Sequence, residues 1–188
     1  NFRDNRRYSY KKKDMPMKHL FVAGSLALLS ATAMLSAQAA DLSGAVGTTD
    51  DGSMVYRVAT QFDFSASWLQ SDTGRLSGYW DGGYTYWEAG HGSDGNNSLS
   101  FSPVFVYEFA GQSVRPFIEA GIGVALFSST KVDGNQLGQA FQFEDRIGLG
   151  LRFAEQEVGV RAMHYSNAGM QDPNDGVESY SLYFRTSL

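Results

Sequence analysis

The feature that most constrains this chain is a regular alternation of large apolar side chains with small or charged ones, which begins after Ala40. Within Leu99–Phe109 the odd positions are mostly large and apolar, whereas Ser100, Ser102 and Glu108 fall at even positions. Successive side chains of a β-strand point to opposite faces, so a period of two separates these classes. The alternation therefore predicts an all-β protein whose strands each have one apolar face.

The pattern divides into eight strands of about ten residues, the length that a tilted membrane-spanning strand needs. We expect strands at residues 42–48, 53–64, 75–88, 98–110, 115–128, 140–154, 157–168 and 177–188. An even number of strands, with a strand at the end of the sequence, predicts a closed antiparallel barrel with both termini on one side.

The connections between these strands differ in length and composition. Residues 110–114 and 154–156 are short, as periplasmic turns are, whereas 88–97, 127–139 and 167–176 are long and polar, as outer loops are. The connection at 65–74 is longer than such a turn requires, and the pattern gives no explanation for it.

The charged residues decide which face of the strands points inward. A soluble, lipocalin-like barrel with an apolar interior is the alternative that alternation alone leaves open. An eight-stranded barrel is filled by side chains, and glycines with paired charges fill it more readily than a Phe or Tyr from every strand. We therefore predict an eight-stranded antiparallel transmembrane β-barrel of the outer membrane. The expected inward charges are Arg57, Glu108, Glu119, Glu144, Arg146, Arg152, Arg161 and Arg185, and the expected aromatic girdle residues, some of which can pack inward instead, are Tyr79, Trp80, Tyr84, Tyr86 and Trp87.

The N-terminal region has the features of a processing signal. Residues 1–16 are polar and basic and are interpreted as an upstream extension, with Met17 or Met15 as the expected start. Residues 17–39 combine a basic start, an apolar stretch and the small-x-small sequence Ala37-Gln38-Ala39, which predicts a cleaved signal peptide. A transmembrane anchor is the less favoured alternative. The barrel domain is then expected to span residues 40–188.

The charge balance and the residue types exclude several function classes. Residues 40–188 carry eight basic and eighteen acidic side chains, so the surface is expected to repel nucleic acid. The chain has no cysteine, and its histidines show no metal-ligand spacing, so no metal or cofactor is expected. His91 is interpreted as a solvated loop residue without an accompanying carboxylate cluster.

A candidate catalytic group lies near the end of the sequence. His164 and Ser166 are two residues apart and share a strand face, and Glu178 begins the next strand, which can return beside His164. A hydroxyl, an imidazole and a carboxylate on one surface are what a base-activated serine nucleophile needs. Asn167, Asn174 and the N–H of Gly169 are available as donors to an oxyanion.

Strand parity places His164, Ser166 and Glu178 on the lipid-facing side, close to the outer loops. Ionisable groups in that position are costly for structure alone, which favours a function. The ordinary alternative is that these are interface residues with their polar atoms in water. The spacing of three residues does not choose between the two interpretations.

Several longer segments resemble one protein family in the same order along the chain: Phe105–Gly111, Pro116–Ala125, Phe143–Gly148, Arg161–Gly169 and Pro173–Ser181. They are similar to the outer-membrane lipid A 3-O-deacylases of the PagL family. The resemblance implies an eight-stranded barrel that hydrolyses the ester-linked 3-hydroxyacyl chain at the 3-position of lipid A in lipopolysaccharide. It implies His164, Ser166 and Glu178 as the triad, Asn174 and Gly169 as the oxyanion hole, and functional positions at Asn167 and Phe143. A homodimer is one of the assemblies it allows.

Two other functions remain as alternatives. The first is a non-catalytic small outer-membrane barrel, an adhesin or a structural anchor, in which the polar trio is incidental. The second is an outer-membrane phospholipase, in which an Asn takes the place of Glu178 and calcium takes part. The presence of Glu178 and the lack of an acidic calcium cluster near the trio disfavour the phospholipase.

Overall fold

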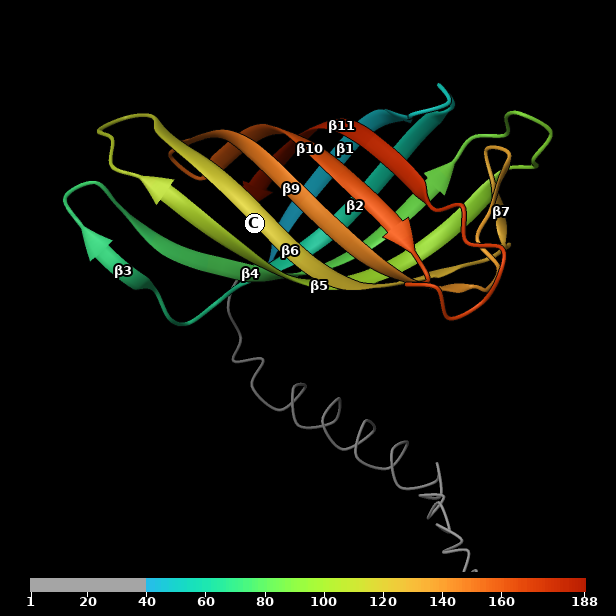
Figure 1. The fold of residues 1–188 in the computed structure, drawn as a ribbon. Coiled ribbons are helices and arrows are strands. Elements are labelled where there is room, and N and C mark those ends of the chain that lie inside the picture. The colour runs from blue at the N-terminus through green and yellow to red at the C-terminus, as the bar shows by residue number, and fades with distance from the viewer. Residues whose placement is uncertain (1–39) are drawn as a thin grey trace, which may run out of the picture. The chain divides into compact units, whose positions relative to one another are not determined.

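The computed structural model describes residues 40–188, which form a closed antiparallel β-barrel (Figure 1). Its eight long strands are β1 (Asp41–Thr49), β2 (Met54–Asp63), β4 (Gly74–Trp87), β5 (Asn96–Phe109), β6 (Arg115–Phe127), β9 (Phe141–Phe153), β10 (Gln156–Ser166) and β11 (Val177–Ser187). Each strand pairs with the next long strand along the chain, and β1 also pairs with β11, which closes the barrel. The eight predicted strands are confirmed, with every end within two residues. The predicted extension and signal peptide lie outside the described residues.

Three short strands were not predicted. β3 (Trp68–Ser71) folds back on the start of β4 and accounts for the long connection at 65–74. β7 (Lys131–Val132) and β8 (Asn135–Gln136) form a hairpin inside the connection between β6 and β9. Asp133 and Gly134 make the hairpin turn with φ of 46° and 90°, the conformation that Asp-Gly favours. β3 and β7 lie toward opposite ends of the barrel in Figure 1.

Side-chain exposure follows the predicted parity. The outward residues Leu99, Ile122 and Ile147 are 63%, 68% and 66% exposed, whereas the inward Glu144 is completely buried. Because the apolar side chains cover the outside and the charges fill the inside, the barrel is built to stand in lipid. Of the predicted girdle residues, Tyr84 and Tyr86 are exposed on the wall, but Tyr79 and Trp87 are buried inside. Among the described residues no helix is long and apolar enough to cross a membrane.

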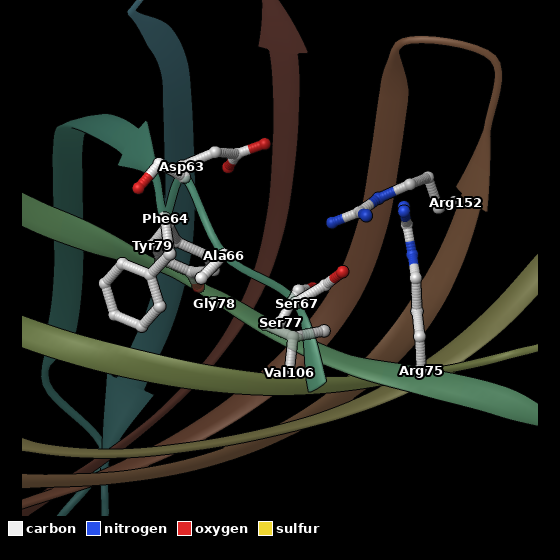
Figure 2. A pocket seen from close by; sticks show the side chains of 11 residues that line it. Asp63, Phe64, Ala66, Ser67, Arg75, Ser77, Gly78, Tyr79, Val106 and Arg152 are labelled. Atoms are coloured by element: carbon white, nitrogen blue, oxygen red, sulfur yellow. The ribbon is translucent and has the colours of Figure 1, made fainter. Parts of the chain in front are cut away.

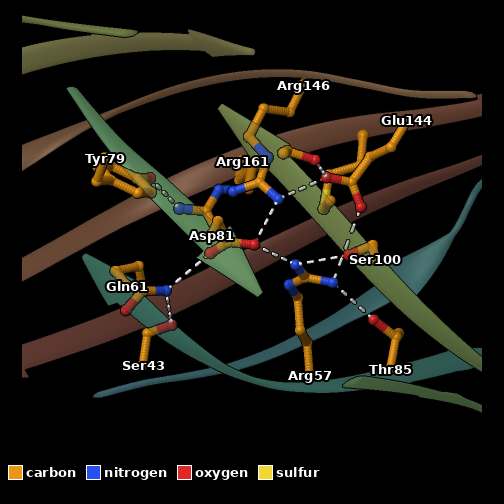
Figure 3. A network of polar contacts seen from close by, with 12 residues as sticks. Ser43, Arg57, Gln61, Tyr79, Asp81, Thr85, Ser100, Glu144, Arg146 and Arg161 are labelled. Carbon is orange, nitrogen blue, oxygen red and sulfur yellow. Dashed lines mark hydrogen bonds and ion pairs between the residues drawn. The ribbon is translucent and has the colours of Figure 1, made fainter. Parts of the chain in front are cut away.

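The interior is a connected set of ion pairs (Figure 3). Arg146 donates to Asp81 at 2.9 Å and to Glu144 at 2.6 Å, and Arg57 also pairs with Asp81. A second group joins Arg161 to Glu119 at 2.6 Å, with the Tyr79 hydroxyl donating to the same carboxylate. Charges taken out of water need such partners. Because these side chains fill the barrel centre, the interior offers no wide lumen to a substrate.

A cavity of about 220 Å³ lies at the end of the barrel that carries β3 (Figure 2). Arg75 and Arg152 line this cavity, and both pair with Glu108, at 3.2 and 2.6 Å. These two guanidinium groups therefore share one carboxylate. Residues 63–67, which also line the cavity, lead from β2 into β3 and are remote in the fold from the outer loops.

Candidate active site

His164 and Glu178 meet across the β10–β11 pairing. They are direct register partners, and His164 Nδ1 lies 2.7 Å from Glu178 Oε1. Their side chains are 42% and 38% exposed on the outer wall. A carboxylate at Nδ1 fixes that nitrogen as the donor, which leaves Nε2 as the basic nitrogen. The predicted pairing of these residues is thus present in the fold.

Ser166 is the last residue of β10 and shares the outward face with His164. Side chains two apart on a strand are separated by about 6.6 Å along the strand. Within the described chain the Ser166 hydroxyl makes no hydrogen bond to His164, and such contacts often tighten only when substrate is bound. On the neighbouring strand β9, Phe143 is the register partner of Ser166, so the two side chains share the outward face.

Gly176 is a site residue that sequence reasoning missed. Its φ is +73°, and a Cβ atom built there would lie 3.1 Å from Cε1 of His164. A Cβ atom here would therefore crowd the imidazole, and the backbone has a conformation that glycine adopts at little cost. The sequence signal was Asp175-Gly176 immediately before a strand, which is a turn pattern.

Asp145 is a second missed residue. It is the register partner of His164 on β9, so an outward row runs from Asp145 through His164 to Glu178. All three line a cavity of about 230 Å³ on the barrel wall. The parity of β9 could have revealed Asp145, because Phe143, Asp145 and Ile147 alternate with inward residues.

The loop after Ser166 is held by its two asparagines. The Asn167 N–H donates to Oδ1 of Asn174 at 2.9 Å, which leaves the amide N–H groups of Asn174 free as donors. The Asn167 side chain is buried and donates to the carbonyls of Leu137 and Gln171 at 2.9 and 2.7 Å. The structure thus gives Asn167 a role in holding the loop.

Gly169 lies in a tight turn of the same loop. Ala168 and Gly169 have φ of 55° and 73°, and the Met170 N–H donates to the carbonyl of Asn167 at 3.1 Å. These values define a type I′ turn. Gly169 is exposed, and no contact within the described residues joins its N–H to Ser166 or His164. Of the predicted oxyanion donors, only Asn174 is bonded to the residue that follows Ser166.

An apolar groove of about 740 Å³ runs along the wall from the site. It shares Ile147, Ala162 and Tyr180 with the cavity beside His164. Ala120 and Ala162 leave it open, and larger apolar side chains border it: Leu76, Phe105, Tyr107, Ile118, Leu149 and Val160. An extended hydrocarbon chain fits such a surface, because apolar contact with it requires no polar partner.

Comparisons with known proteins identify the family of this chain. Residues 54–187 match the family described as lipid A 3-O-deacylase (PagL). The chain is 60% identical to the lipid A deacylase PagL of Pseudomonas aeruginosa over 92% of this chain and all of that protein. It is 35% identical to the lipid A deacylase PagL of Bordetella bronchiseptica over 93% of this chain and 97% of that protein.

A solved structure is similar over the whole barrel. The crystal structure of the outer membrane enzyme PagL superposes with a TM-score of 0.77 at 60% identity, covering 79% of this chain and 99% of the crystallised chain. The resemblance predicted from the sequence is confirmed. The sequence identity, the similar fold and the family match together show that the chain belongs to the lipid A 3-O-deacylase (PagL) family.

Proposed function

We propose that this chain is a lipid A 3-O-deacylase of the outer membrane, with Ser166 as nucleophile, His164 as general base and Glu178 as the group that orients His164. One observation carries the assignment of the site: His164 and Glu178 form a 2.7 Å contact on the lipid-facing wall, two residues from an outward serine. Ionisable groups facing hydrocarbon serve structure poorly, whereas a lipid esterase needs them there.

In this proposal the reaction takes the course of a serine esterase. Ser166 Oγ attacks the carbonyl carbon of the acyl ester while His164 Nε2 takes its proton. When the tetrahedral intermediate collapses, the bond between the carbonyl carbon and the sugar oxygen breaks, and His164 returns the proton to that oxygen. Water, activated by His164, then hydrolyses the acyl-enzyme and releases the 3-hydroxy fatty acid. Glu178 stabilises the imidazolium in both halves of the reaction.

The oxyanion needs donors next to Ser166, and Asn174 is the best placed. Its Oδ1 is already used by the Asn167 N–H, so its amide nitrogen is directed elsewhere. Gly169 N–H is the second donor in this proposal, and it requires a movement of the loop at 168–170 on substrate binding. Fixed donors of this kind typically account for about 10²–10³-fold in rate.

The location of the site suits a membrane lipid substrate. The groove beside His164 receives the scissile acyl chain while the sugar stays at the level of the outer loops, so no lipid has to enter the filled interior. We further propose that residues 17–39 direct export and are removed. Every residue of the proposed site comes from one chain.

Mass spectrometry of lipid A from cells that express the chain tests the proposal. The parent and the control Ser113→Ala, at an exposed turn serine, should each remove one 3-hydroxyacyl group, and Ser166→Ala should remove none. An unchanged spectrum for all three would support the non-catalytic barrel. Equal deacylation by Ser166→Ala would show that Ser166 is not the nucleophile.

A further inference from the structure

The β7–β8 hairpin is tied to two other outer connections through one buried side chain. Asp133 is 2% exposed, and its carboxylate accepts hydrogen bonds from Ser53 Oγ at 2.6 Å and from the Thr49 hydroxyl. It also faces His91 Nδ1 at 2.7 Å, a single carboxylate partner for that ring. A carboxylate with this many partners fixes the hairpin relative to both connections.

Further contacts hold the same hairpin in place. Gly134 N–H donates to Ser93 Oγ at 2.7 Å, and Lys131 Nζ donates to the Gly92 carbonyl at 2.8 Å. Below the hairpin, Val132 and Leu137 are buried in an apolar cluster at the loop end of the barrel, together with Tyr165. The hairpin is therefore anchored both to its neighbouring loops and to the core beneath it.

The other side of this segment contacts the loop that carries the proposed oxyanion donor. Asp175 and Gln136 exchange two hydrogen bonds: Gln136 N–H to Asp175 Oδ2 at 2.9 Å, and Asp175 N–H to the Gln136 carbonyl at 3.1 Å. The Leu137 carbonyl accepts from the Asn167 side chain at 2.9 Å. Asn174 thus lies between two residues, Asn167 and Asp175, that are both bonded to the 136–137 segment.

We propose that Asp133 is a positioning residue for this reaction: by anchoring the β7–β8 hairpin, it holds the loop at 167–176 so that Asn174 points at the oxyanion. The proposal rests on the proposed function of Asn174. It concerns residues remote in sequence from the triad, and it acts through backbone groups of residues 136 and 137. Asp133 itself touches neither His164 nor Ser166 among the contacts of the described chain.

The expected signature is a loss of kcat with little change in KM. An oxyanion donor interacts with charge that develops only in the transition state, so misplacing it lowers kcat and leaves ground-state binding alone. Displacement of a catalytic group by 1 Å can cost about 10²-fold. Asp133→Asn keeps a residue that tolerates positive φ and removes one acceptor oxygen, so we expect a loss of about threefold to tenfold.

The experiment measures kcat and KM of the full barrel on detergent-dispersed lipid A for four variants. They are Asp133→Asn, the control Asp94→Asn, Asn174→Ala, and the double variant Asp133→Asn with Asn174→Ala. Asp94 is exposed, lies in the outer connection at 88–95 and makes no side-chain hydrogen bond among the described residues, so the control removes the same charge without the anchor. Hydrogen exchange at residues 167–176 reports the loop directly, independent of activity.

Asp133→Asn should lower kcat, and Asp94→Asn should not. In the Asn174→Ala background the Asp133 substitution should cost no more than about twofold, because the donor it positions is already absent. The proposal would be overturned if the loss of kcat in the double variant equalled the product of the losses in Asp133→Asn and Asn174→Ala. It would also be overturned if Asp133→Asn and Asp94→Asn had the same kcat. If the parent enzyme proves inactive on lipid A, the proposed function fails. The hydrogen-exchange comparison then still decides the anchoring: faster exchange at 167–176 in Asp133→Asn supports it, and unchanged exchange refutes it.

Discussion

Replacing Glu178 should show how much the orienting carboxylate contributes to the rate of deacylation. Glu178→Ala removes the partner of His164 Nδ1, which is now held at 2.7 Å. The imidazole loses both its fixed tautomer and the negative charge that offsets the imidazolium formed in the transition state. Glu178→Gln retains a carbonyl oxygen that can accept from Nδ1 but carries no charge. The pair of variants therefore distinguishes orientation from electrostatic stabilisation.

The magnitude follows from the contact and its exposure. A hydrogen bond to a charged group contributes about 1.5–3 kcal/mol, which corresponds to about 10-fold to 150-fold in rate. Both side chains are near 40% exposed, so solvent screening places the loss for Glu178→Gln toward the lower end of that range. The loss of rate for Glu178→Ala should be near the upper end of the range, because the His164 ring is then also free to rotate.

The assay is the initial rate of release of 3-hydroxy fatty acid from purified lipid A. Glu155→Ala, at an exposed turn glutamate, is the matched control and should keep the parent rate. Heat-dependent electrophoretic mobility checks that each variant forms the barrel. If Glu178→Ala kept more than about half of the parent kcat, Glu178 would not be the orienting residue, and the reasoning from the 2.7 Å contact would be refuted.

Three further predictions follow from other parts of the structure. Gly176→Ala should lower kcat about tenfold, because its Cβ would lie 3.1 Å from the His164 ring at a φ of +73°, where a non-glycine residue costs about 1–3 kcal/mol; an unchanged rate would show that the ring does not need this space. Glu119→Ala should reduce the free energy of unfolding in lipid vesicles by about 3–5 kcal/mol, because Arg161 is left buried and unpaired, whereas Glu119→Leu combined with Arg161→Met should restore most of it. The hydrogen bond that the His91 ring donates to Asp133, together with the charge of Asp133, raises the pKa of His91, so this pair stabilises the outer loops fully below the ordinary pKa of about 6.5 and its contribution is lost as pH rises through the raised pKa. After correction for the intrinsic pH dependence of exchange, backbone amides near residue 91 should therefore be less protected above the raised pKa of His91 than below it. His91→Gln should abolish this change in protection.

Asp133, the partner of His91 in this contact, gives the opposite pH dependence of stability. Burial raises the pKa of Asp133, but hydrogen bonds from Ser53, Thr49 and His91 outweigh burial and lower it overall. Its contribution to stability is present above the ordinary carboxyl pKa and is lost as pH falls through the lowered value. The loops are thus expected to be best ordered between the two titrations.

Much of the site followed from local periodicity, and what did not follow depends on pairing between strands. The same-face relation of His164 and Ser166 needs only the two-residue period of one strand. The contact of His164 with Glu178 also needed the β10–β11 register, which the position of Glu178 at the start of the next strand suggested. Asp145 and Gly176 were missed because each reaches His164 through a neighbouring strand or through a left-handed backbone conformation, and neither is visible in composition.

The sequence by itself determined the barrel, its eight strands, the face that meets lipid and the family, because alternation and motif order are properties of the chain alone. Only the tertiary structure decided the β3 and β7–β8 hairpins, the inward position of Tyr79 and Trp87, and the anchor at Asp133. The physical reason is that the burial of Tyr79 and Trp87 and the anchor at Asp133 rest on contacts between segments far apart in sequence, such as Asp133 with Thr49 across 84 residues, and that the hairpin strands are too short to show an alternating pattern. No local pattern encodes which loops will meet once the barrel closes.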